Sequence, residues 1–291
     1  MQSSDRHIQK IHPLISPAVL AEDLPATAGI MARVTESREI IEAILDGHDP
    51  RLLVVAGPCS VHDPAAAVDY AAQLFESTRH LQDRLHIVMR VYFEKPRTVM
   101  GWKGLINDPD LDGSFRINKG LRLARKLLLD VLDAGLPCGT EFLDTTFGQY
   151  YADLISWGAI GARTAESQIH RELASGLSMP VGIKNRTDGN VQVAVDAIRA
   201  ARHRHVFPSL TREGAPAIYE TAGNRYGHLI LRGGDVSGPN YAQADVAAAE
   251  ELLAAHHLPA RLVVDCSHGN SHKDYRRQAD VVEEVCAQRQ R

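Results

Sequence analysis

Arginine and lysine side chains follow a series of short apolar runs in this 291-residue chain. If these runs are parallel strands, their carboxyl ends meet at one edge of the sheet, and the cations that follow converge there. An Arg fork suits phosphate and carboxylate oxygens, and Lys supplies a point charge. A lone Arg is usually a solvated surface residue, but six at one topological position predict a site for a polyanionic small molecule. The six are Arg90, Lys95, Arg97, Arg163, Lys184 and Arg232.

A cysteine and a histidine stand at the ends of the first and last of these runs. A thiolate from Cys59 and an imidazole from His268 could together hold a divalent transition metal. The alternative is a buried structural Cys and a hydrogen-bonded His. Cys266 shares a strand face with His268 at i, i+2, so it is a rival ligand. The spacing alone leaves these possibilities open.

The apolar runs alternate with amphipathic stretches, and Gly or Pro often marks the joins. Strict alternation of strand and helix predicts βαβ units and a parallel sheet covered on both faces. The expected strands are Leu52–Ala56, Leu85–Tyr92, Pro137–Phe142, Ala159–Arg163, Val181–Lys184, His228–Arg232 and Arg261–Cys266. The expected helices are Pro64–Leu81, Ser114–Ala134, Gly189–Arg202, Tyr241–His257 and Tyr275–Gln290.

Two segments fall outside this alternation. Residues 1–50 form an N-terminal extension with a helix around Ala26–Asp46, which leaves 51–291 for the strand–helix units. His203–Thr221 carries alternating residues around a turn signal and predicts an inserted hairpin. Seven strands are expected, whereas a (β/α)8 barrel closes with eight. The pattern therefore fits either a doubly wound open sheet or a barrel without its last unit.

Composition limits the class of partner and compartment. The formal net charge of −4 argues against a nucleic-acid binder, which usually needs a strongly basic face. The polar N-terminal sequence does not resemble a signal peptide, and no apolar run is long enough to cross a membrane. The four cysteines form no C-x-x-C pair, so we expect neither a zinc ribbon nor a disulfide framework. A cytoplasmic protein is the expectation.

The strand ends carry short motifs that resemble those of type I DAHP synthases (3-deoxy-D-arabino-heptulosonate 7-phosphate synthases). Each motif is short, but together, in order and spaced over nearly the whole chain, they are specific. They are Ala56-Gly57-Pro58-Cys59-Ser60, Lys95-Pro96-Arg97-Thr98 with Gly101-Trp102-Lys103-Gly104, Gly161-Ala162-Arg163-Thr164-Ala165-Glu166-Ser167-Gln168, Gly182-Ile183-Lys184-Asn185, Ile230-Leu231-Arg232-Gly233-Gly234 and Val264-Asp265-Cys266-Ser267-His268-Gly269-Asn270.

The resemblance implies an α/β fold, a (β/α)8 TIM barrel with an N-terminal extension. It implies a transferase that condenses phosphoenolpyruvate with D-erythrose 4-phosphate in the first step of the shikimate pathway to aromatic amino acids. By motif, the phosphoenolpyruvate site is implied at Arg90, Arg163, Lys184 and Arg232. The erythrose 4-phosphate site is implied at Lys95, Arg97 and Thr98, with Lys95 also catalytic. Three further substrate-site residues are implied, namely Pro96, Glu141 and Ala162. Cys59 and His268 are implied as ligands of Mn, Fe, Co or Zn.

The chain also departs from the family pattern. It ends at Arg291, before the eighth strand and before the Glu and Asp that complete the family's metal site. From this we expect an incomplete barrel, an incomplete metal site and a poor catalyst. Arg186 stands where the family has Gly, so a side chain there could crowd the loop after the fifth strand. The Thr145-Thr146-Phe147-Gly148 segment differs from the usual pattern as well.

Rival functions remain beside this one. The first is 3-deoxy-octulosonate 8-phosphate synthase, although the Lys-Pro-Arg-Thr loop and Trp102 favour the tetrose phosphate. The second is a non-catalytic remnant that binds anions or pairs with an intact homologue. The resemblance also implies that the extension and the hairpin bind an aromatic amino-acid inhibitor and form contacts of a homo-oligomer. Ser178 and Ser209 are candidates for that pocket by position.

Overall fold

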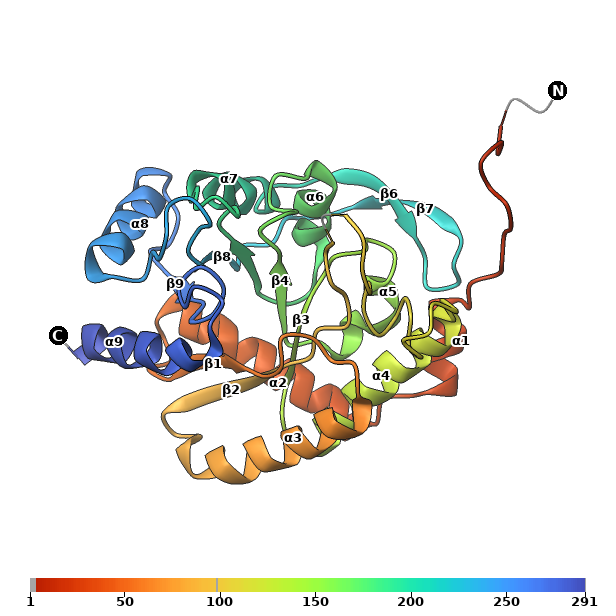
Figure 1. Cartoon of the computed structure of the whole chain (residues 1–291), viewed down its shortest axis with the longest axis horizontal. Helices are drawn as coiled ribbons and strands as arrows, with labels where there is room; N and C mark the ends of the chain where they lie inside the picture. Colours follow the sequence, from red (N-terminus) through yellow and green to blue (C-terminus); the bar gives the residue numbers. More distant parts are fainter. Residues whose placement is uncertain (1–3, 98, 291) are drawn as a thin grey trace.

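Seven parallel strands form a curled sheet at the centre of the molecule, with helices around it (Figure 1). The computed structural model describes residues 4–97 and 99–290. The strand order is β1-β2-β3-β4-β5-β8-β9, and every neighbouring pair is parallel, so the barrel-type fold is confirmed. Within the described residues, β1 and β9 are the outer strands. The bounds are β1 Leu52–Ala56, β2 Leu85–Arg90, β3 Cys138–Glu141, β4 Trp157–Ile160, β5 Val181–Lys184, β8 Gly227–Leu231 and β9 Leu262–Val264.

The connecting helices cover the outer face of the sheet. They include α3 Pro64–Thr78, α4 Ile117–Asp133, α5 Gly148–Tyr151, α6 Gln168–Gly176, α7 Gln192–Ala201, α8 Gln243–Ala255 and α9 Gln278–Gln290. The sequence prediction missed α5 and α6, which are short. It also placed β4 too late, because Gly158 looked like the join before the strand. Trp157 and Gly158 are both buried, Trp157 pairs with β3, and Gly158 pairs with β3 and β5.

The N-terminal extension contributes α1 Pro17–Asp23 and α2 Ala28–Asp46. The Thr27 side chain caps α2 by accepting from the Ile30 amide at 3.2 Å, and Gly47 ends the helix with φ of 78°. Ile41 and Leu45 on α2 pack into the apolar interior of the sheet, whose other members are Val88, Tyr92, Trp157, Ala159, Ile230, Leu53, Val55 and Val263. This helix therefore plugs the N-terminal end of the sheet.

The inserted hairpin is confirmed as β6 Val206–Leu210 and β7 Pro216–Glu220, which pair antiparallel. Its turn contacts the extension, because the amide of Ala18 donates to the carbonyl of Arg212 at 2.7 Å. In Figure 1 the chain before α1, drawn in red, runs away from the body of the molecule. The boundary between an extension of 1–50 and a barrel of 51–291 stays a prediction.

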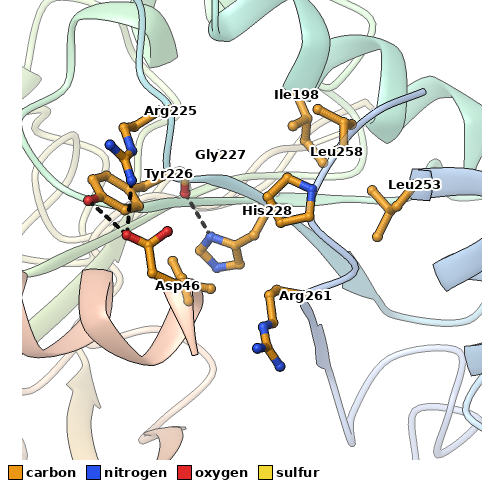
Figure 2. Close-up of a pocket in the computed structure, with 11 residues that line it drawn as sticks. Asp46, Ile198, Arg225, Tyr226, Gly227, His228, Leu253, Leu258 and Arg261 are labelled. Atoms are coloured by element: carbon orange, nitrogen blue, oxygen red, sulfur yellow. Dashed lines mark hydrogen bonds and ion pairs between the residues drawn. The ribbon is translucent and has the colours of Figure 1, made fainter. Parts of the chain in front are cut away.

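A small pocket lies at the N-terminal end of β8, between the end of α2 and helices α7 and α8 (Figure 2). Asp46 at the end of α2 accepts from Arg225 at 2.9 Å and from the Tyr226 hydroxyl at 3.3 Å. His228 and Arg261 complete its polar lining. Among the described residues, no helix combines the length and apolar character needed to cross a membrane.

Candidate active site

The predicted cations lie at the C-terminal end of the parallel strands. Arg90 is the last residue of β2 and Lys184 the last of β5, while Arg232 directly follows β8. Arg163 lies three residues beyond β4, and Lys95 lies in the loop after β2. Lys184 and Arg232 are buried, Arg90 and Lys95 are half-buried, and Arg163 is exposed. Parallel pairing explains this arrangement, since it carries all strand ends to the same side.

Lys184 and His268 both contact the carboxylate of Asp265. The Lys184 Nζ lies 3.0 Å from Asp265 Oδ2, and His268 Nδ1 lies 2.8 Å from the same oxygen. Burial raises the pKa of Asp265, but Lys184 and His268 together outweigh that effect and hold the pKa well below its usual range. Asp265 is therefore an anion that neutralises part of the rim charge. The sequence prediction quoted it within a motif but gave it no role.

A second contact group joins the ends of β1 and β2. Arg90 donates to the carbonyls of Pro58 at 3.0 Å and Cys59 at 2.8 Å, and its guanidinium lies 3.7 Å from the centre of the Tyr92 ring. Lys95 Nζ lies 3.6 Å from Cys59 Sγ. Gly57 makes this possible, because with φ of 154° a Cβ there would lie 2.6 Å from the Arg90 carbonyl oxygen.

Three buried asparagines fix the loops after β5, β8 and β9, and sequence reasoning gave none of them a role. Asn185 Oδ1 accepts from the Arg232 amide at 2.8 Å, and Asn240 Oδ1 accepts from the Gly233 amide at 2.7 Å. Asn270 Oδ1 accepts from the Asn240 amide at 2.8 Å. The sequence did point to two of them, because Asn185 and Asn270 are the last residues of motifs that follow strands.

Arg232 and Arg163 are close enough to influence each other. Burial lowers the pKa of the Arg232 guanidinium and Arg163 lowers it further, whereas Asp235 and Asp265 oppose the shift. Such mutual repulsion is relieved when an anion binds between the two side chains. The pair therefore fits a phosphate or carboxylate group at this corner of the rim.

The remaining predicted substrate residues surround this cluster. Arg97 is exposed, and its Nε donates to the carbonyl of Trp102 at 2.8 Å. Pro96 and Ala162 are half-buried in the loops after β2 and β4. Glu141 ends β3 and lies over Gly161, where a Cβ would be 2.2 Å from its Oε1. Thr98 lies outside the described residues.

The two predicted metal ligands lie at opposite ends of the strand order. Cys59 is exposed next to Lys95, and His268 has a positive φ of 51° that directs its ring toward Asp265. The rival Cys266 donates instead to the carbonyl of Val264 on its own strand, at 3.8 Å. Across residues 4–97 and 99–290, no group of three or more His, Cys, Asp or Glu side chains is arranged to hold a metal ion.

Arg186 does not crowd the loop after β5. Its side chain pairs with Glu166 at 2.8 Å and with Asp188, so it links the loops after β4 and β5. The Gly189 amide donates to the carbonyl of Arg186 at 3.0 Å, which closes the loop in an ordinary turn. The expected steric conflict is therefore absent at this residue.

Known proteins resemble this chain in sequence and in fold. Residues 28–290 match the profile described as the DAHP synthetase I family. The chain is 60% identical over 279 residues to the Trp-sensitive phospho-2-dehydro-3-deoxyheptonate aldolase of Escherichia coli K12, covering 96% of this chain and 80% of the relative. The relative from Buchnera aphidicola is 57% identical over the same length. The solved structure of the Francisella tularensis aldolase superposes with a TM-score of 0.95 at 53% identity, covering 97% of this chain and 82% of that one. The chain belongs to the DAHP synthetase I family.

Proposed function

We propose that this chain condenses phosphoenolpyruvate with D-erythrose 4-phosphate to give 3-deoxy-D-arabino-heptulosonate 7-phosphate and phosphate, the first step of the shikimate pathway. The observation that carries the proposal is the cluster of Arg90, Lys95, Arg163, Lys184 and Arg232 at one rim. Both substrates are phosphorylated anions, and bringing them together against their repulsion requires fixed cations. The naming of relatives at 60% identity as phospho-2-dehydro-3-deoxyheptonate aldolases supports the same reaction.

Within this cluster, the cations at or just after the ends of β2, β4, β5 and β8 suit the more highly charged reactant. Lys184, Arg232, Arg163 and Arg90 would hold the carboxylate and phosphate of phosphoenolpyruvate, with Glu141 and Ala162 at the edge of the same site. The loop that contains Lys95, Pro96, Arg97 and Thr98 would hold erythrose 4-phosphate. An exposed Arg97 suits a substrate that enters second and covers the first.

The reaction joins carbon 3 of phosphoenolpyruvate to the aldehyde carbon of the tetrose. Electrons move onto the aldehyde oxygen, water adds at carbon 2, and phosphate leaves. Lys95 lies at the border of the two sites, so we propose that its ammonium stabilises and protonates the developing alkoxide. The fixed charges of the rim would hold both reactants in line and exclude competing orientations.

A divalent transition metal is the cofactor that the family implies. The Cys59 thiol and the His268 imidazole suit such an ion, and Asp265 on Nδ1 leaves Nε2 of His268 available. We propose that these two residues contribute ligands, although the described residues bring no third donor of this kind to them. When bound, the metal would act as a Lewis acid for the aldehyde oxygen.

The extension and the hairpin would form a regulatory and subunit-contact region. Two observations support this part of the proposal. Relatives carry the name Trp-sensitive. The hairpin exposes Val206 and Ile218, and its turn contacts α1. Titrating Trp, Phe and Tyr against the purified protein, with sedimentation to follow its mass, tests both roles. An absence of any effect of all three amino acids would remove the inhibitor site.

Turnover is the direct test of the proposed reaction. The chain is purified, supplied with Mn²⁺, and assayed for phosphate release from phosphoenolpyruvate with erythrose 4-phosphate or arabinose 5-phosphate. We expect release with the tetrose phosphate. Preference for the pentose phosphate would favour 3-deoxy-octulosonate 8-phosphate synthase. Binding of phosphoenolpyruvate without turnover on either aldehyde would favour a non-catalytic anion-binding protein.

A further inference from the structure

Glu94 is a buried carboxyl group at the base of the sugar-phosphate loop, and the proposed reaction does not use it. Its residue is 7% exposed and directly precedes Lys95. Glu94 and Gly104 form an isolated antiparallel bridge, and the Lys95 amide donates to the carbonyl of Lys103 at 2.9 Å. Gly104 has φ of 118°, and a Cβ there would lie 1.9 Å from the carbonyl oxygen of Phe93. The loop therefore has a narrow neck, and Glu94 is one side of it.

The side chain of Glu94 leaves this neck and contacts the loop after β3. Its Oε2 accepts from the amide of Asp144 at 3.3 Å. The carboxylate of Asp144 is occupied elsewhere, because it accepts from the amides of Thr146 at 2.7 Å and Phe147 at 3.3 Å. Glu94 thus connects the sugar-phosphate loop to residues 143–147.

Residues 143–147 are in turn fixed to the next unit of the barrel. The carbonyl of Leu143 accepts from His170 Nε2 at 2.7 Å, and His170 Nδ1 lies 2.9 Å from Ser167 Oγ. His170 is on α6, which follows the loop of Arg163. A continuous set of contacts therefore runs from the neck of the sugar-phosphate loop to the start of α6, the helix that follows the loop of Arg163.

We propose that Glu94 is a positioning residue whose buried carboxyl group pins the neck of the sugar-phosphate loop to the loop after β3, and so holds Lys95 in place. That this loop binds erythrose 4-phosphate rests on the proposed function. That Glu94 fixes the loop rests on the contacts above, and the two are tested separately below.

The surroundings of Glu94 favour its protonated form at neutral pH. Burial, followed by the charges of Asp144 and Glu141, raises the pKa of Glu94 to about 8, although backbone amides of Asp144 and Leu143 oppose the shift. The Tyr151 hydroxyl is buried nearby without a hydrogen-bond partner among the described residues, and burial followed by Glu94 raises its pKa. The groups that face Glu94 are therefore Asp144, Glu141 and Tyr151, and none of them supplies a positive charge.

Ionisation of Glu94 above pH 8 would place a charge beside two carboxylates in a buried site. We expect the carboxylate to move toward water and the neck to loosen. Glu94→Gln keeps the shape and hydrogen-bonding capacity of the neutral acid but cannot ionise. Glu94→Ala removes the contact at every pH. The exposed Glu76→Gln on α3 is a matched control for the loss of a carboxylate.

Trypsin cleavage after Arg97 and Lys103 measures the loop without any substrate. At pH 7 we expect Glu94→Ala to be cut at least about fivefold faster than the native chain, because opening of a held segment governs cleavage. Glu94→Gln and Glu76→Gln should match the native chain. Between pH 7 and 9 the native chain should become easier to cut than Glu94→Gln compared at the same pH. Equal rates for those two chains across this range would overturn the proposal, as would rapid cutting of Glu94→Gln at pH 7.

Kinetics then link the loop to its substrate. With alkaline pH, the KM for erythrose 4-phosphate should rise more in the native chain than in Glu94→Gln. The KM for phosphoenolpyruvate should be the same in the two chains at each pH. A matching change in both KM values would contradict a role confined to the sugar-phosphate loop. If trypsin gives the expected pattern and neither chain turns over, the positioning role holds and the proposed function fails.

Discussion

The two ends of the sheet bury polar groups in opposite ways. At the C-terminal rim, Lys184 and Arg232 are buried as cations, with Asp265 as an internal counter-ion. At the N-terminal end, burial lowers the pKa of His86 and His228 to about 4, which favours the neutral imidazole at pH 7. His228 accepts from Trp157 Nε1 at 3.1 Å, and its Nδ1 lies 3.0 Å from the carbonyl of Tyr226, so both ring nitrogens are satisfied. One end retains charge that an external anion can use, whereas these two imidazoles at the other end are uncharged at neutral pH.

This difference separates function from stability within one fold. Chemistry on parallel barrels lies at the carboxyl ends of the strands, where the loops can vary without altering the core. The opposite end is closed by Ile41 and Leu45 of α2, so its polar groups must be satisfied internally. Substitutions at the rim should therefore mainly change activity. Substitutions at the N-terminal end of the sheet should mainly change the free energy of unfolding.

Lys184→Ala should have the largest effect, because this residue serves both purposes. Removing one charge-assisted contact to phosphoenolpyruvate should lower kcat/KM by about 100-fold. The variant also leaves the buried Asp265 with His268 alone, which should lower the free energy of unfolding by about 3 kcal/mol. Steady-state kinetics and urea unfolding measure the two losses.

The exposed Lys126 on α4 is the matched control for Lys184. It pairs with Asp130 in solvent, so Lys126→Ala should change the free energy of unfolding by less than about 0.5 kcal/mol. Native-like kinetics in Lys184→Ala would show that Lys184 does not bind phosphoenolpyruvate. The C-terminal end of the sheet would then not differ from the N-terminal end in function.

His228→Gln should act on stability and in a pH-dependent manner. Burial lowers the pKa of His228 from 6.5 to about 4. Between these values the unfolded chain binds a proton that the folded chain does not, so stability rises with pH across that window. The stability advantage of the native chain over the variant should be fully present above pH 6.5. It should shrink by about 3 kcal/mol as pH falls to 4.

The pH dependence is measured by urea unfolding followed through Trp157 fluorescence. Both KM values should stay native in His228→Gln at pH 7.5, because the residue lies at the N-terminal end of β8, away from the rim. A constant stability difference from pH 4 to 7.5 would show that His228 is not held neutral. A changed KM would show that the two ends are coupled.

The overall fold was predictable because its signals are local. The strands Leu52–Ala56 and Val181–Lys184 were predicted with their observed bounds, since each is an apolar run bounded by turn residues. The short helix α6 was missed, because nine residues give little periodicity. The plug formed by Ile41 and Leu45 was not foreseen either. The sequence predicts a helix here, but the surface that its apolar face covers depends on tertiary packing.

The position of the cations was predictable where residue type and strand end coincide, whereas their role as substrate ligands stays a prediction. Lys184 and Arg232 follow this rule, and the structure places both at the rim. Asp265, Asn240 and Glu94 did not stand out, because the role of a carboxylate or an amide depends on its contacts with other units of the barrel. Asn240 lies 30 positions from its partner Asn270, so no local pattern connects them.

Arg163→Ala should affect activity alone. Within the described part of the chain, its exposed guanidinium makes no hydrogen bond or ion pair. We therefore expect kcat/KM for phosphoenolpyruvate to fall by about 10- to 100-fold while the melting temperature stays native. Kinetics and thermal unfolding of the same preparation give both values. A marked loss of stability would mean that the rim, too, depends on its cations for folding.

Arg97→Ala should have the smallest effect, because this side chain is exposed and solvent screens its charge. We expect the KM for erythrose 4-phosphate to rise about tenfold, with the KM for phosphoenolpyruvate and the free energy of unfolding unchanged. Arg97→Lys retains the charge but loses the fork, so it should fall between the native chain and Arg97→Ala. A rise in the KM for phosphoenolpyruvate alone would reverse the assignment of the two phosphate sites. The rim would then bind its substrates in the opposite arrangement, with the exposed loop serving the three-carbon acid.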